Sequence, residues 1–320
     1  MPMDNEGATH PHTQADNASE KFEPRYKMSN SRILVVLVLY KRAPDESESF
    51  TSLRNILQKR PELAVNTTLL VYDNSPEAHT LPQMPMATRY VSNPANPGLA
   101  EAYNSGLRLA NEEGIEWLLL LDHDTLLTEA YVEELSDLIS SLTEMEPAAC
   151  IIVPKLVYSR RGRRAVHSPH FMPRLTHHGV ELDFRGIAAD ELSGFNSATT
   201  LRVRDLEALG GFPIHYSMEF LDHVVFHALQ KAGGKIWVMN SLLQHDLSTT
   251  NLEKNVSLLR YKKILYAERD FHMQMGAIDR TWYRLRRLKQ GLGHLAKTKD
   301  KRYAAWDIRA ALGALGKNPS

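Results

Sequence analysis

The hydrophobic and polar positions along the chain follow two alternating periods. Continuous apolar runs, typical of strands buried on both faces, lie at 33–39, 68–72, 89–91, 117–121 and 148–157. Apolar residues at helical spacing occupy 47–59, 100–113 and 128–144. Strands that alternate with helices predict an α/β fold with a mostly parallel central sheet flanked by helices.

The helix that ends at Glu113 has the clearest boundary signals. Asn96 is a good N-cap and Pro97 suits the first helical position, while Gly114 closes the far end. Asn104 lies inside this helix, where asparagine has no propensity advantage. It is therefore either a polar surface residue or a contact to a ligand or a loop.

The pattern loosens over residues 159–192, which suit a hairpin or an irregular excursion. Four histidines occur there, His167, His170, His177 and His178. Their spacing matches no zinc pattern, so we expect a solvated or acceptor-facing loop. A strand at 199–203, a helix up to Lys231 and a strand at 235–239 follow.

The chain from about residue 255 is expected to be helical. Apolar residues recur there at helical spacing, namely Trp282, Leu285, Leu288, Leu292 and Leu295. Nearly all charged residues between Arg280 and Arg302 are basic, which is typical of attachment to an anionic membrane surface. The alternative is an ordinary helix that packs its apolar stripe on the body. Gly291 and Gly293 weaken the helix.

Composition excludes several classes of protein. Lys plus Arg and Asp plus Glu both number 38, so no global field points to nucleic acid. The single cysteine excludes a disulfide framework. No apolar run approaches the length that spans a bilayer, and the polar start lacks the order of a signal peptide. We therefore expect a cytoplasmic protein, with peripheral contact at the inner face of the membrane through its basic end.

Two carboxylates end the apolar run at 117–121. Asp122 and Asp124 are two residues apart in extended chain and can face one polar site. Hard oxygen ligands suit Mg²⁺ or Mn²⁺, especially when substrate phosphates complete the shell. Asp73 ends its own strand in the same way, at the edge where open α/β sheets bind ligands. Asp-x-Asp by itself is more often a solvated turn or a helix cap.

Six stretches together resemble the family 2 glycosyltransferases of GT-A fold, which are inverting enzymes with nucleotide-sugar donors. The stretches lie at 71–75, 96–106, 119–124, 210–212, 221–223 and 244–248. Their order and spacing match as well, and the resemblance covers about 32–318. Within the family the chain looks most like rhamnosyltransferase-type enzymes.

The resemblance implies a donor site. Asp73 would accept a hydrogen bond from the imide N–H of uracil or thymine, and Tyr40 would lie against that base. Asp122 would lie near the ribose. Three further residues would line the nucleotide and sugar side of the cleft, namely Asn96, Gly98 and Asn104.

The resemblance also implies a metal site and a base. Asp124 and His245 would hold Mg²⁺ or Mn²⁺ on the diphosphate, and Asp222 would be the catalytic base. The family pattern has Glu before this Asp and Arg six residues beyond it, where this chain has Leu221 and Ala228. The departure puts the orientation of the base in doubt, and Glu219 is the alternative base.

The expected division is a disordered tail over 1–30, a GT-A domain over 31–250 and a basic, amphipathic helical region over 251–320. Within the GT-A domain, 31–125 would bind the nucleotide and 126–250 the acceptor.

The expected function is transfer of a sugar, with L-rhamnose as one candidate, from a UDP- or dTDP-sugar to a glycan or lipid-linked saccharide in cell-surface polysaccharide synthesis. Two alternatives are a non-catalytic protein that binds nucleotide sugar or glycan, and a nucleotidyltransferase. The second would want a glycine-rich loop after the first strand, which 40–45 lacks.

Overall fold

A computed structural model describes residues 32–160, 163–171, 175–244, 252 and 256–316. The tail predicted to be disordered and the predicted metal ligand His245 lie outside the described residues.

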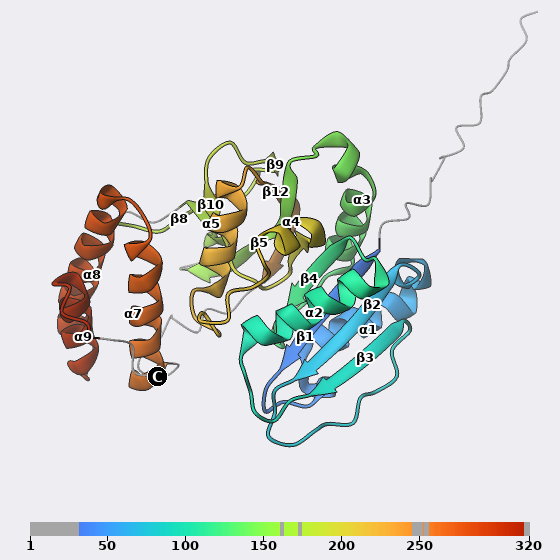
Figure 1. Ribbon diagram of the computed structural model, residues 1–320, viewed down its shortest axis with the longest axis horizontal. Coiled ribbons are helices and arrows are strands. Elements are labelled where there is room, and N and C mark those ends of the chain that lie inside the picture. The colour runs from blue at the N-terminus through green and yellow to red at the C-terminus, as the bar shows by residue number, and fades with distance from the viewer. Residues whose placement is uncertain (1–31, 161–162, 172–174, 245–251, 253–255, 317–320) are drawn as a thin grey trace, which may run out of the picture.

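A mostly parallel sheet forms the centre of the molecule (Figure 1). In the described part of the chain its strands are β1 (Ile33–Leu39), β2 (Thr67–Asp73), β3 (Ala87–Ser92), β4 (Trp117–Leu121), β5 (Ala149–Arg160), β6 (Arg163–Ser168), β9 (Gly186–Ile187), β11 (Thr199–Arg202) and β12 (Lys235–Gln244). The order is β3-β2-β1-β4-β11-β5-β12-β9, and β6 pairs with β5. β11 runs antiparallel between β4 and β5. The predicted α/β class with a mostly parallel sheet is confirmed.

Helices cover both faces of this sheet. They are α1 (Glu48–Lys59), α2 (Leu99–Glu113), α3 (Glu129–Met145), α4 (Val203–Ala208) and α5 (Leu221–Lys231), with short 3-10 turns at Pro44–Glu46 and Pro61–Ala64. Alternate residues of β1 enter opposite cores, as a pleated strand requires. Val35 packs with residues of α1 and α3, whereas Val36 packs with residues of α2 and α5.

The start of α2 differs from its prediction. The N-cap is Gly98, with φ 96°, and not Asn96, so Pro97 lies before the helix. The amides of Leu99 and Ala100 donate to the carbonyl of Ser217, which satisfies the helix start in place of a side-chain cap. A Cβ at Gly98 would lie 2.4 Å from that carbonyl oxygen, so the close approach needs glycine. The helix ends at Gly114 as predicted.

The predicted excursion is a hairpin and a small sheet. β6 folds back on β5, and the order β10-β7-β8 joins Leu192–Ser193, His170–Phe171 and His178–Gly179. Ser193 lies opposite His170 in this sheet, and Phe171 lies opposite His178.

Three helices follow the sheet, as predicted, and stand together beside α5 in Figure 1. They are α7 (Leu258–Met273), α8 (Ala277–Lys297) and α9 (Arg302–Ala311). Gly291 does not interrupt α8: it lies against α9, where a Cβ would approach Asp307 within 3.1 Å. Within the described residues, no helix has the length and apolar character that crossing a membrane requires.

Of the two alternatives for the leucine stripe of α8, packing on the body is not observed. Four leucines of α8 are exposed, namely Leu285, Leu288, Leu292 and Leu295, while Arg286 and Arg287 are buried. These two arginines, and not the leucines, face the neighbouring helices.

Candidate active site

The two acids that follow β4 differ in environment. The carboxylate of Asp122 is half-buried and accepts hydrogen bonds from the hydroxyl of Ser197 at 2.7 Å and from that of Tyr103 at 3.4 Å. Asp124 is exposed and has no hydrogen bond or ion pair within the described residues. A free, exposed carboxylate at the carboxyl end of a parallel strand fits a Mg²⁺ or Mn²⁺ ion that keeps water and phosphate ligands.

Serines at the start of α1 hold the loop that carries these acids. Ser47 caps α1 and also donates to the carbonyl of His123 at 2.9 Å. The hydroxyl of Ser49 accepts from the amide of Thr125 at 3.0 Å and contacts the carbonyl of Asp122. Sequence reasoning missed this contact, because the signal is only a second serine inside a capped helix start.

Asp222 lies in the first turn of α5, where the helix dipole favours a carboxylate. Its Oδ1 accepts from the amide of His223 at 2.8 Å. The preceding Phe220 adopts φ 65°, a left-handed conformation that costs free energy for a non-glycine residue and is typical of functional sites.

Tyr103 is a buried tyrosine beside Asp122. Burial raises the pKa of Tyr103 well above its usual value, and the negative charges of Asp122 and Asp222 raise it further. Its ring packs against Phe212 with centroids 5.2 Å apart. Asp122 thus contacts this buried tyrosine, and the charge of Asp222 acts on it as well.

Glu219 is paired with a residue that sequence reasoning missed. Arg260 of α7 donates to its carboxylate at 2.8 Å. Burial raises the pKa of Glu219 and the charge of Asp222 adds to this effect, while Arg260 opposes it. Arg260 therefore places a cation near the loop before α5, in a chain that has Ala228 where the family pattern has arginine.

Asp73 and Tyr40, the two residues predicted to contact the uracil or thymine base of the donor, differ in exposure. Asp73 is fully buried, and its carboxylate accepts from the amide of Ser75 at 2.9 Å and from His79 and Tyr90 at 2.7 Å each. Burial alone would raise the pKa of Asp73, but these hydrogen bonds lower it. The ring of Tyr40 is 42% exposed, so it is open to a flat ligand where Asp73 is not.

The remaining residues predicted to line the donor side, Asn96, Gly98 and Asn104, lie in α2 or just before it. Asn104 joins it to the loop at Phe212: its amide nitrogen donates to the carbonyl and its oxygen accepts from the amide, both at 2.8 Å. Of the alternatives for Asn104, the loop contact is the one observed. Gly98 is covered by Ser217, and Asn96 is exposed with φ 46°.

Histidine rings gather beside Asp222. The ring centroids of His170 and His177 lie 4.3 Å apart, and those of His170 and His223 5.6 Å. Nε2 of His223 lies 3.9 Å from Asp222, and Nδ1 lies 2.5 Å from the hydroxyl of Ser193. Burial lowers the pKa of His170 well below its usual value, and neighbouring histidines add to this, so the ring is neutral at neutral pH.

This cluster does not form a metal centre. Within the part of the chain that is described, no group of at least three His, Cys, Asp or Glu side chains could hold a metal ion. The histidines are predicted to be solvated or to face the acceptor. Solvation is wrong for His170, which is buried, whereas His177 is exposed. The position beside Asp222 fits the acceptor-facing alternative.

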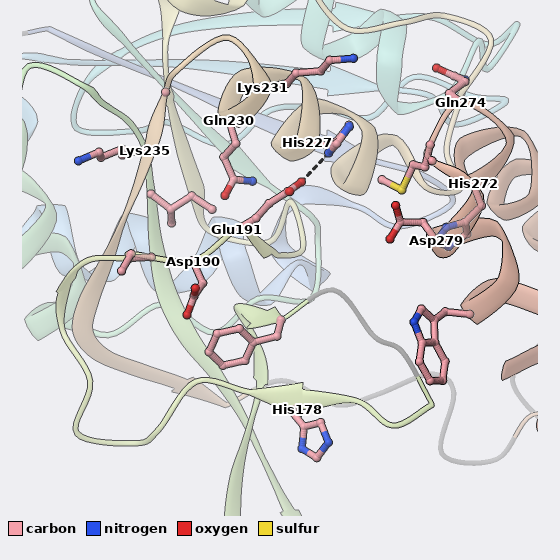
Figure 2. Close-up of a pocket in the computed structure, with 18 of the residues that line it drawn as sticks. His178, Asp190, Glu191, His227, Gln230, Lys231, Lys235, His272, Gln274 and Asp279 are labelled. Carbon is pink, nitrogen blue, oxygen red and sulfur yellow. Dashed lines mark hydrogen bonds and ion pairs between the residues drawn. The ribbon is translucent and has the colours of Figure 1, made fainter. Parts of the chain in front are cut away.

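A groove of about 1080 Å³ lies elsewhere, between α5, the segment at 188–191 and the turn from α7 to α8 (Figure 2). None of the predicted site residues lines it.

Comparison with known proteins gives one family. Residues 34–186 match the model of Glycosyl transferase family 2. No curated protein matches. Among solved structures, the crystal structure of S. aureus TarS is 13% identical, with a TM-score of 0.49 over 87% of this chain and 55% of that chain.

A crystal structure of S. aureus TarS 1-349 is 12% identical, with a TM-score of 0.48 over 88% of this chain and 92% of that chain. The chain thus spans about half the length of the first of these structures. The match to the family model spans residues 34–186, a little under half of the chain, and falls on the mostly parallel sheet flanked by helices that a GT-A fold has.

Proposed function

We propose that the protein is an inverting glycosyltransferase that moves a sugar from a UDP- or dTDP-sugar to a saccharide or lipid-linked acceptor in cell-surface polysaccharide synthesis. The observation that carries this proposal is the match of residues 34–186 to Glycosyl transferase family 2, with Asp122 at the end of β4 and Asp222 in the first turn of α5. Asp122 would be the donor-side carboxylate and Asp222 the acceptor-side base. L-rhamnose is the sugar to test first.

The reaction needs a single base. Asp222 would take the proton of the acceptor hydroxyl while that oxygen attacks the anomeric carbon of the donor. The new glycosidic bond forms on the face opposite the bond to the diphosphate, which breaks with its electron pair leaving on the nucleoside diphosphate. The configuration is therefore inverted. Unlike glycoside hydrolysis, this transfer needs no paired carboxylic acid.

The donor would lie along the carboxyl edge of the sheet. Asp124, together with His245, would hold a Mg²⁺ or Mn²⁺ ion, which neutralises charge on the diphosphate when bound. Asp122 would lie near the ribose and Tyr40 against the base. For Asp73 to accept from the base, His79 or Tyr90 would have to give up its present hydrogen bond.

Donor turnover tests this function. The protein is incubated with Mn²⁺, a saccharide acceptor mixture and a panel of UDP- and dTDP-sugars, and release of nucleoside diphosphate is measured. We expect Asp222→Asn to keep donor affinity and to lose transfer by roughly 10²–10⁴-fold. Glu219→Gln is the matched control on the same loop and should retain most of the turnover.

Three outcomes would contradict the base assignment or the transferase function. Unchanged turnover in Asp222→Asn would remove the base assignment, and loss only in Glu219→Gln would give that role to Glu219. Tight donor binding without release from any donor would favour the non-catalytic binding protein.

We also propose peripheral attachment to the cytoplasmic face of an anionic membrane, which would bring the enzyme to a lipid-linked acceptor. The exposed leucines of α8 support it. Exposed basic residues flank them on the same helix, namely Arg284, Lys289 and Lys297. Leucines and cations on one exposed helix suit the boundary between acyl chains and anionic headgroups.

A further inference from the structure

The groove of about 1080 Å³ is large enough for an extended ligand, since small-molecule sites typically measure roughly 300–1,000 Å³. Its walls come from several separate parts of the chain (Figure 2). α5 contributes His227 and Gln230, the segment after β9 contributes Asp190 and Glu191, and the start of α8 contributes Asp279. A groove assembled from separate elements is a feature of the folded protein and not of one loop.

The lining combines carboxylates with aromatic rings. Asp190, Glu191 and Asp279 are exposed along it, and Glu191 accepts a 2.5 Å hydrogen bond from His227. Phe171, 40% exposed, and Trp282 add aromatic surface. Carboxylates accept hydrogen bonds from hydroxyl groups, and a flat ring covers the apolar face of a pyranose. Such a lining suits a saccharide.

The same lining disfavours an anionic ligand. Three carboxylates face the groove, against the exposed ammonium groups of Lys231 and Lys235. His272 adds no positive charge, because burial lowers its pKa to about 4. Phosphate or nucleotide would meet repulsion from the acidic wall.

α5 connects the groove to the reaction centre. His223, His227 and Gln230 are four and three residues apart and therefore share one helix face. At about 1.5 Å per residue, His227 lies roughly 7 Å along the axis from Asp222, and Lys231 roughly 13 Å. This face contacts the segment at 191–193, where Gln230 bonds both backbone groups of Leu192. An acceptor of a few sugar units whose reacting hydroxyl lies at Asp222 is long enough to reach the groove past the outer edge of this contact.

We propose that the groove is a distal acceptor subsite, which binds saccharide units of the acceptor chain beyond the unit that receives the sugar. The proposal rests on the proposed transferase function. The subsite gives the enzyme a preference for oligomeric acceptors over single sugars. Trp282 and Asp279 are its specificity-determining residues, and neither contacts the reacting atoms.

Binding is measured first, on the Asp222→Asn protein with UDP and Mn²⁺, so that no turnover interferes. The probes are rhamnose and N-acetylglucosamine oligosaccharides of one to six units. Their binding affinity is measured by isothermal titration calorimetry. We expect affinity to rise with chain length in at least one series. Adding Trp282→Ala should weaken the longest member of that series by about tenfold, or 1.4 kcal/mol, and leave the single sugar unchanged.

Turnover then separates this proposal from the transferase function. In otherwise native protein, Trp282→Ala and Asp279→Asn should raise the KM of the longer acceptors and leave kcat unchanged. Gln290→Ala, on an exposed position of α8 outside the groove, is the matched control. Thermal unfolding of each variant shows whether it folds as the native protein does.

Each outcome has one meaning. If Trp282→Ala and Asp279→Asn transfer sugar as the native protein does, with the same dependence on acceptor length, the proposed acceptor subsite is wrong and the proposed transferase function stands. Affinity that does not rise with chain length in either series also overturns it. Failure of native protein to release nucleoside diphosphate from any donor, with length-dependent saccharide binding retained, overturns the transferase function instead.

Discussion

The carboxyl edge of the sheet and the three C-terminal helices place their polar groups in opposite ways. At the sheet edge, apolar strands are buried and the carboxylates of Asp122 and Asp124 emerge where β4 ends. In α8, the arginines Arg286 and Arg287 are buried while four leucines are exposed. The difference teaches that an amphipathic pattern identifies a helix and its two faces, but not which face packs.

Buried acids decide the packing of α8. Glu268 of α7 is ion-paired with both arginines, at 2.6 Å to Arg286, and Asp307 of α9 pairs with Arg287 at 3.0 Å. Asp307 also accepts from Tyr261 at 2.7 Å. Burial would raise the pKa of Glu268, but the two arginines lower it, so it is ionised beside them.

Removing Glu268 should give the largest effect. Glu268→Gln removes the buried carboxylate that pairs with both Arg286 and Arg287, and breaking a buried pair in this way costs about 3–5 kcal/mol. Urea unfolding measures the free energy. The control is Glu62→Gln at the exposed pair with Arg60, which should change little. Equal free energies in the two variants would mean that the buried network does not organise the helices.

Acid should destabilise the same network through His272. Burial lowers the pKa of His272 to about 4 from its usual 6.5, and Arg286 donates to its Nε2 at 3.0 Å, which requires that atom to be unprotonated. The unfolded chain binds the proton near pH 6.5 and the folded chain only near pH 4. The free energy of unfolding therefore falls between these values, by on the order of 3 kcal/mol.

The variant His272→Gln isolates this contribution. Burial also lowers the pKa of His170, and partial cover of the ring by His167 and His170 lowers that of His177 although the residue is exposed as a whole, so both act in the same direction and remain in the variant. Unfolding free energies are measured from pH 7 to pH 4 for both proteins. Parallel curves would show that His272 takes up its proton equally in the folded and unfolded states.

At the sheet edge, Ser49→Ala should have an intermediate effect. It leaves the buried amide of Thr125 without its partner, a loss of about 1–3 kcal/mol. The loop that carries Asp124 then loosens, so the KM for donor should rise more than kcat falls. Ser140→Ala, on the exposed surface of α3, is the control. A normal donor KM with lowered stability would confine the role of Ser49 to folding.

Features set by neighbouring residues could be predicted from the sequence, whereas contacts between distant residues could not. Strands and most helix ends could be read from local patterns, since burial and capping act over a few residues. The N-cap at Gly98 could not, because its partner is the carbonyl of Ser217, far along the chain. The pairing of Arg260 with Glu219 could not be read for the same reason. Long-range polar contacts leave no periodic signal.

The exposed leucines should give the smallest effect on stability and still test attachment. Leu288 and Leu292 are 40% and 56% exposed, so Leu288→Ser and Leu292→Ser should each change the unfolding free energy by at most about 0.5 kcal/mol. Burying a leucine in acyl chains is worth about 1.5–3 kcal/mol, so the double variant should lose sedimentation with vesicles of phosphatidylglycerol and phosphatidylcholine. Vesicles of phosphatidylcholine alone should bind neither protein, because the cations need anionic headgroups. Unfolding free energies lowered by several kcal/mol would instead show that these leucines pack inside the protein, and equal sedimentation of both proteins would end the proposal of membrane attachment through α8.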